Sequence, residues 1–218
     1  MESSLVKEKT MEPIADLIGF FLNIDDYLSA VTQAYGGFTY LILFLIVFLE
    51  TGIVITPFLP GDSLLFAAGT LAANGSLDAV LLVAALSAAA VAGDTVNYWI
   101  GHNLGPRVFK RFLKKEHLDS AHLFYEKHGS KTIVIARFVP IIRTFAPFVA
   151  GIAKMNYLRF LVYNIAGGTA WVCIFVFGGY YFGSQPIVKQ NFTLAILAIV
   201  FLSIMPATIE LLRNRRQW

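Results

Sequence analysis

The chain has 218 residues, of which 57% are hydrophobic and only 14% are charged, against roughly 25% charged residues in an ordinary soluble domain. This balance argues against a soluble enzyme. The formal charge is +3, but the basic residues are clustered, which in an apolar chain indicates membrane topology rather than binding to nucleic acid. The single cysteine, Cys173, excludes an internal disulfide and a cysteine metal cage.

A single membrane domain is expected over 1–218, because no linker-like tract divides the chain. Residues 1–35 lack the order of a signal peptide and are expected to remain as an N-terminal interfacial segment. A bilayer core of about 30 Å needs roughly 20 helical residues. Apolar stretches of suitable length predict about four transmembrane helices, at residues 38–52, 77–101, 160–182 and 192–209.

The distribution of basic residues predicts which side of the membrane each connection faces. Eleven of the 17 Lys and Arg residues fall between Arg107 and Arg159, and three arginines close the chain. The positive-inside rule places both regions in the cytoplasm, so the N- and C-termini are expected there and the connections 74–78 and 183–191 outside. Residues 106–130 mix basic and apolar side chains and are expected to form amphipathic helices on the inner surface.

Two segments, 53–73 and 131–153, do not resemble ordinary transmembrane helices. Each contains two prolines around a polar break, followed by an apolar helical stretch that closes on Ala-Gly. Both are predicted to be re-entrant hairpins, the first dipping from outside and the second from inside. Irregular backbone at membrane depth is tolerated only in protein or beside an aqueous cavity. The plan predicts an inverted repeat, as in many secondary transporters, with a cavity where the two hairpins meet.

Four ionisable residues lie in or beside these hairpins: Glu50, Asp62, Arg137 and Arg143. A charge at bilayer depth costs about 2.5 kcal/mol or more, so such residues usually face a cavity and pair with one another. Arg137 and Arg143 are candidates for binding an anionic headgroup, because the guanidinium fork matches phosphate oxygens. Glu50 and Asp62 are candidates for proton coupling. The half-helices predicted to begin near Asp62 and Ala146 would add their N-terminal partial charge.

Less specific interpretations of these residues remain open. The acids and arginines could form structural bridges, or Asp62 could serve only as a helix N-cap. Secondary cavity candidates are Asp94, Asn97, Thr144 and Asn164, although Asp94 could equally form an interhelical hydrogen bond. Trp171 is expected to pack in the core.

The sequence offers little support for a metal or for catalysis. The spacing of the histidines is not that of a zinc site; they are His102, His117, His122 and His128. No nucleophile-elbow, zincin or phosphate-loop motif occurs. The chain is therefore expected to be no enzyme and to need no cofactor, no metal and no nucleotide.

Several motifs resemble the DedA family of bacterial inner-membrane proteins, part of the VTT-domain group. They lie at residues 48–63, 93–101, 124–129, 136–151 and 163–164. The acids of the family match Glu50 and Asp62, and its arginines match Arg137 and Arg143.

This resemblance implies lipid translocation in a bacterial inner membrane, coupled to the proton-motive force. The implied substrate is a lipid phosphate such as undecaprenyl phosphate, and the implied partners are that lipid and protons, with a homo-oligomer as a further possibility. The alternatives are a phospholipid (phosphatidylethanolamine) flippase or scramblase and a non-transporting membrane assembly factor. From the residues alone, the sequence predicts only an inverted-repeat transporter for something anionic.

Overall fold

The computed structural model describes residues 24–53, 61–112, 129, 131–138 and 140–183, with several more between 185 and 199. Every main element in these ranges is an α-helix, which confirms the expected all-α class for this part of the chain. The helices are α2 (Ile24–Tyr35), α3 (Phe38–Gly52), α4 (Gly61–Ala73), α5 (Ala79–Phe112), α7 (Lys131–Ala136), α8 (Pro140–Ile152) and α9 (Tyr157–Phe182).

Two of these helices are long and apolar enough to cross a membrane. They are Ala79–Asn103, within α5, and Tyr157–Phe182, the whole of α9. Each contains most or all of one predicted transmembrane helix. Helix α3 has the predicted bounds, but its 15 residues extend only about 22 Å at 1.5 Å per residue. The fourth predicted span, 192–209, lies largely outside the described residues, as do residues 1–23 and 113–128.

A tight turn joins α4 to α5 in the connection predicted to face outward. Gly75 has a φ of +78°, a conformation that glycine adopts without steric cost. The Asp78 carboxylate then accepts a hydrogen bond of 2.8 Å from the Leu81 N–H, which caps the start of α5. The short turn lets α4 and α5 follow one another without a long loop.

The second broken segment differs from its prediction in the position of the break. The polar break was expected between the two prolines, Pro140 and Pro147, with a half-helix beginning near Ala146. Instead α7 ends at Ala136, and α8 begins at Pro140 and continues through Pro147 to Ile152. Proline suits the first turn of a helix, where its missing N–H has no partner to lose. Arg143 consequently lies in the first turn of α8 rather than before a helix.

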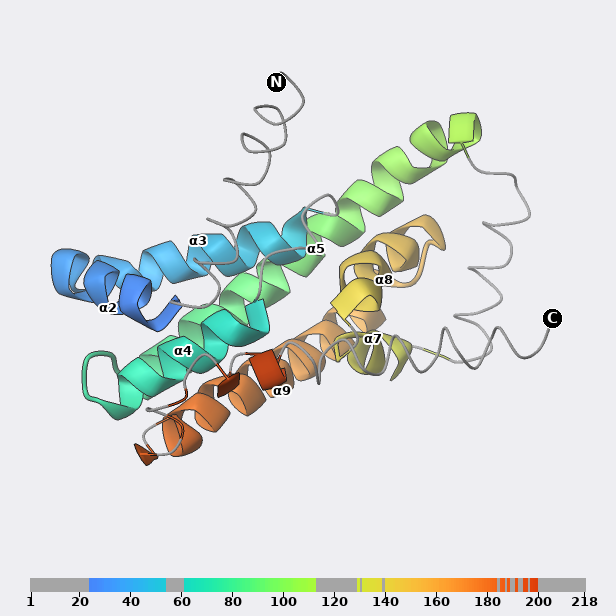
Figure 1. Ribbon diagram of the computed structural model, residues 1–218. Coiled ribbons are helices and arrows are strands. Elements are labelled where there is room, and N and C mark those ends of the chain that lie inside the picture. The colour runs from blue at the N-terminus through green and yellow to red at the C-terminus, as the bar shows by residue number, and fades with distance from the viewer. Residues whose placement is uncertain are drawn as a thin grey trace, which may run out of the picture.

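The short helices α4 and α8 each pack against a long helix from the other half of the chain. Helix α4 lies along α9, and α8 lies along α5 (Figure 1). Glycines permit both close approaches: a Cβ on Gly69 would collide with the Val176 carbonyl, and one on Gly151 would collide with the Tyr98 carbonyl. In the view of Figure 1, α4 lies toward the left end of the bundle and α8 toward the right.

Apolar side chains form both the interior and much of the outer surface. One buried cluster involves α3, α4, α5 and α9, and a smaller one involves α5, α7, α8 and α9. Large apolar side chains are also exposed along one face of α3 and one of α9, including Leu41, Leu45, Leu49, Val162 and Ile165. Contiguous exposed apolar surface of this kind suits contact with lipid.

Candidate functional site

Five ionisable side chains from five different segments converge inside the bundle. Three are acids, on α3, α4 and α5, and two are arginines, one directly after α7 and one in α8: Glu50, Asp62, Asp94, Arg137 and Arg143. Their side chains are between 2% and 12% exposed. We call these five residues the ionic cluster.

Arg143 connects the two acids expected to couple protons. Its Nη1 lies 2.6 Å from Oδ1 of Asp62, and its Nη2 pairs with Oε1 of Glu50. The same Glu50 oxygen accepts a hydrogen bond of 3.3 Å from the N–H of Gly61, at the start of α4. A helix N-terminus favours a negative charge. Gly61 also has no room for a side chain, because a Cβ there would fall on the Glu50 carboxylate.

Arg137 has a separate set of partners. Its Nη2 lies 2.6 Å from Oδ2 of Asp94, and its Nη1 donates a hydrogen bond of 2.9 Å to Oδ1 of Asn164. Asn164 in turn donates to the carbonyl of Val91 at 3.1 Å. Arg137 therefore pairs with Asp94, which had been expected only as a secondary candidate.

Trp171 contacts Asp62 and both arginines of the ionic cluster. Its indole N–H donates a hydrogen bond of 2.8 Å to Oδ1 of Asp62. The ring centroid lies 4.9 Å from Cζ of Arg143 and 5.8 Å from Cζ of Arg137, within the range of a cation–π interaction. Trp171 had been expected only to pack in the core. The sequence signal for its contact with the ionic cluster is its position seven residues, or two helical turns, after Asn164. This spacing places both side chains on one face of α9.

Asn97 ties the end of α3 to α8 beside the ionic cluster. Its side-chain amide donates to the carbonyl of Thr51 at 3.1 Å and to the carbonyl of Thr144 at 2.8 Å. Thr51 is in the last turn of α3, where carbonyls lack a helical partner. Asn97 is fully buried. It therefore fixes the relative positions of two segments that carry Glu50 and Arg143.

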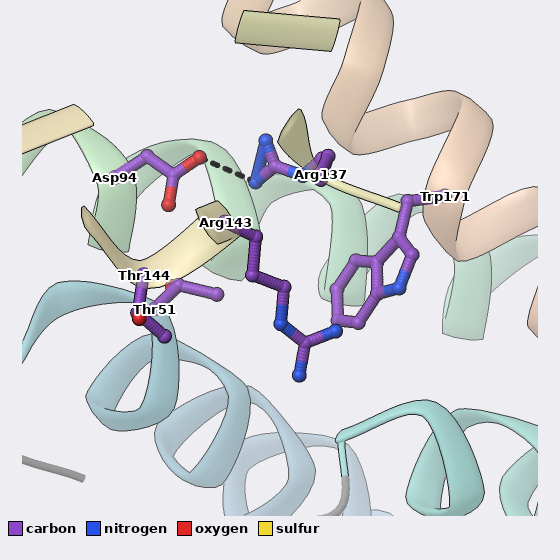
Figure 2. Close-up of a pocket in the computed structure, with 6 residues that line it drawn as sticks. All are labelled: Thr51, Asp94, Arg137, Arg143, Thr144 and Trp171. Carbon is purple, nitrogen blue, oxygen red and sulfur yellow. Dashed lines mark ion pairs between the residues drawn. The ribbon is translucent and has the colours of Figure 1, made fainter. Parts of the chain in front are cut away.

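A small cavity opens beside both arginines (Figure 2). Its lining consists of Thr51, Asp94, Arg137, Arg143, Thr144 and Trp171. Figure 2 shows Arg143 alongside the Trp171 ring and Arg137 reaching toward Asp94. The cavity volume is about 10 Å³, which accommodates about one water molecule. The site is thus closed in this conformation, with the guanidinium groups engaged by protein carboxylates.

All eight candidate residues lie in or next to this site, although their pairing differs from expectation. Glu50, Asp62 and Arg143 form one group, while Arg137 joins Asp94 and Asn164 in another. His102 lies further along α5, in an aromatic cluster with Tyr98 and Trp99. The other three histidines lie outside the described residues. Among the residues described, no group of three or more His, Cys, Asp or Glu side chains could hold a metal ion.

Two membrane-length apolar helices, apolar outer faces and a buried ionic cluster are together typical of an α-helical membrane protein. Residues 59–181 match the VTT domain family. The chain is 49% identical to Protein DedA of Escherichia coli K12 over 212 residues, which cover 94% of this chain and 97% of that protein. It is 34% identical to the inner membrane protein YqjA of the same organism, over 74% of this chain and 76% of that protein.

A third relative comes from a mycobacterium. The uncharacterized membrane protein Rv0364 of Mycobacterium tuberculosis H37Rv is 46% identical over 180 residues, covering 80% of this chain and 79% of that protein. No solved structure matches the chain significantly. The chain therefore belongs to the DedA family of VTT-domain membrane proteins.

Proposed function

We propose that this protein moves a lipid phosphate, undecaprenyl phosphate being the preferred candidate, from the outer to the cytoplasmic leaflet of a bacterial inner membrane. The observation that carries the proposal is that Arg143 is held by two carboxylates beside a cavity that Arg137 also lines. A guanidinium fork binds carboxylate and phosphate by the same geometry. Its carboxylate partners can therefore be exchanged for a phosphate group.

The proposed membrane arrangement keeps segments 53–73 and 131–153 as re-entrant hairpins. Helices α4 and α8 have 13 residues each, about 20 Å, and neither crosses a core of about 30 Å. They lie toward opposite ends of the bundle (Figure 1), so each would enter the membrane from its own side. The tips of the two hairpins would meet at the ionic cluster. Both termini of the chain would lie in the cytoplasm.

Proton coupling follows from competition for Arg143. In this conformation Glu50 and Asp62 occupy both terminal nitrogens of that arginine. Once both acids are protonated, neither holds the fork by its charge, and the lipid phosphate can take their place. Loss of the protons on the cytoplasmic side restores the ion pairs and expels the phosphate. Arg137, which lines the same cavity, would bind the same phosphate.

Leaflet-resolved transport in proteoliposomes tests this function. We would compare a polyprenyl phosphate with phosphatidylethanolamine at two pH gradients, using wild type, Asp62→Asn and Asp78→Asn. The proposal expects faster flux of the polyprenyl phosphate, a dependence on the gradient in wild type and no such dependence in Asp62→Asn. Asp78 is exposed and only caps α5, so its amide variant should behave as wild type.

The closed cavity favours one alternative, in which the ionic cluster only holds the helices of an assembly factor together. Arg143→Ala, compared with wild type, separates the two functions. In a transporter this change would abolish lipid flux while the helices still insert. In an assembly factor it would impair the assembly of partner proteins, and wild type itself would show no flux. Flux of both lipids without any dependence on the pH gradient would instead indicate a scramblase.

A further inference from the structure

The ionic cluster contains more acids than bases. Helices α3, α4 and α5 contribute one acid each, namely Glu50, Asp62 and Asp94. Among the residues that the structure describes, Arg137 and Arg143 are the bases paired with them. Helix α9 faces the cluster with Asn164 and Trp171, neither of which titrates. Residues 54–60, which precede α4, contain no ionisable residue. With every group ionised, the cluster would carry a net charge of −1.

The five residues are one electrostatic unit rather than two independent pairs. Asp62 is 2.6 Å from Arg143 and 2.8 Å from the indole nitrogen of Trp171, and the Trp171 ring faces both arginines. The same small cavity touches Asp94, Arg137 and Arg143. Charges this close interact strongly when water is excluded. The two arginines therefore join the three acids into one charge balance.

A buried surplus charge is removed most readily by binding a proton. Arginine stays charged at any physiological pH, so only the acids can change state. A buried carboxylate in excess of the bases around it becomes neutral rather than remaining ionised. Glu50 is the acid best placed for this, because it is only 1% exposed and its Oε2 is buried without a hydrogen-bond partner among the described residues.

We propose that the ionic cluster holds one resident proton in this conformation, on Oε2 of Glu50, and that the charge of Asp94 is what makes this proton necessary. Asp94 contacts a different arginine from Glu50, so it acts on Glu50 through the charge balance rather than by contact. Asp94 is thus a positioning residue for the proton. The resident proton does not depend on the proposed lipid substrate.

Infrared spectroscopy of the purified full-length protein in detergent, at a pH where exposed acids are ionised, tests the proposal. The carboxylic-acid C=O stretch reports protonated side chains. We expect one such band in wild type, and we expect it to be lost both in Glu50→Gln and in Asp94→Asn. The exposed Asp78→Asn serves as the matched control and should keep the band. Protein labelled with ¹³C at the aspartate carboxyl carbon should show the band unshifted, because the proton is on a glutamate.

Each contrary result overturns a stated part of the inference. A wild-type protein without the band holds no resident proton. A band that persists at full strength in a folded Asp94→Asn protein shows that charge balance does not control it, and a band that shifts on aspartate labelling removes the proton from Glu50. Should Asp94→Asn not fold, Asp62→Asn removes the same charge and must also lose the band. Failure of lipid transport in liposomes would leave all these spectra unchanged, so the two proposals fail separately.

Discussion

Arg137 and Arg143 differ in the kind of partner that holds them. Arg143 bridges two acids from helices α3 and α4, and both bonds depend on charges that protons can remove. Arg137 also pairs with an acid, but it donates to the neutral side chain of Asn164, which keeps its bond whatever the protonation state. We therefore expect Arg143 to exchange partners during a transport cycle and Arg137 to remain in place.

Replacing Arg137 by lysine tests the fork rather than the charge. One ammonium group cannot reproduce the two directions in which Arg137 contacts Asp94 and Asn164. We expect lipid flux in proteoliposomes to fall at least about tenfold, equivalent to about 1.4 kcal/mol, with normal insertion. Arg159→Lys, at an exposed position, is the control. Unchanged flux in Arg137→Lys would contradict a role for its fork in binding phosphate.

Gly61 determines where the Glu50 carboxylate can lie. A Cβ in Gly61→Ala would collide with that carboxylate, so we expect Glu50 to be displaced from Arg143 and the protein to be destabilised by about 1–3 kcal/mol. Thermal unfolding in detergent measures this change. Ser63→Ala is a control in the same turn, because the Ser63 hydroxyl is buried without a partner among the described residues and its loss should cost little. Equal stability of the two variants would refute the steric argument.

At the scale of helices, the two contacts between short and long helices are equivalent. Gly69 on α4 meets the Val176 carbonyl of α9, and Gly179 on α9 meets the Phe66 carbonyl. The second contact repeats the first: Gly151 meets the Tyr98 carbonyl, and Gly101 meets the Phe148 carbonyl. In both, glycines on each helix let the backbones approach closely. Four glycines in equivalent positions support the proposed inverted repeat.

These contacts predict a sharp contrast between neighbouring glycines of α9. In Gly179→Ala the new methyl group would meet the Phe66 carbonyl, whereas a Cβ at Gly178 would have no neighbour closer than 3.9 Å. We expect Gly179→Ala to lower the free energy of unfolding by about 1–3 kcal/mol through overpacking. Gly178→Ala should be neutral or raise it by up to about 1 kcal/mol, because alanine favours a helix. Denaturation in detergent compares the two variants, and a similar loss in both would contradict this packing.

At the scale of the molecule, the long helices α5 and α9 carry the two short helices toward opposite ends of the bundle (Figure 1). The ionic cluster takes residues from both halves of the chain, since Asp62 and Arg143 are 81 positions apart in sequence. Trp171, which binds Asp62, is 109 positions from it. A small relative movement of the halves would therefore change which acids Arg143 contacts.

The proposed topology predicts opposite accessibility for the two connections at the hairpins. In a background of Cys173→Ala, which removes the chain's one cysteine, Ser76→Cys should react with a membrane-impermeant thiol reagent in intact spheroplasts. Lys131→Cys should react only after permeabilisation. Both positions are exposed in the structure, so burial does not explain a difference. Labelling of both from the same side would contradict opposed hairpins, and the cysteine-free background provides the blank.

Much of this organisation can be predicted from the sequence because it depends on local composition. Long uncharged stretches predict α5 and α9, and charges inside apolar segments mark Glu50, Asp62 and Arg143 as functional candidates whatever their partners. The prediction was wrong about Pro147, because a proline in an apolar segment does not by itself show whether packing will keep the helix continuous around it.

The sequence by itself determined that the chain is an α-helical membrane protein and that a few buried charges must be accommodated, since the cost of a charge in an apolar segment does not depend on the fold. The tertiary structure alone decided which charges meet. It paired Arg137 with Asp94, placed Trp171 against both arginines and brought three acids to two bases. These contacts join residues far apart in the chain, and they arise from the crossing of helices at glycines rather than from any local pattern.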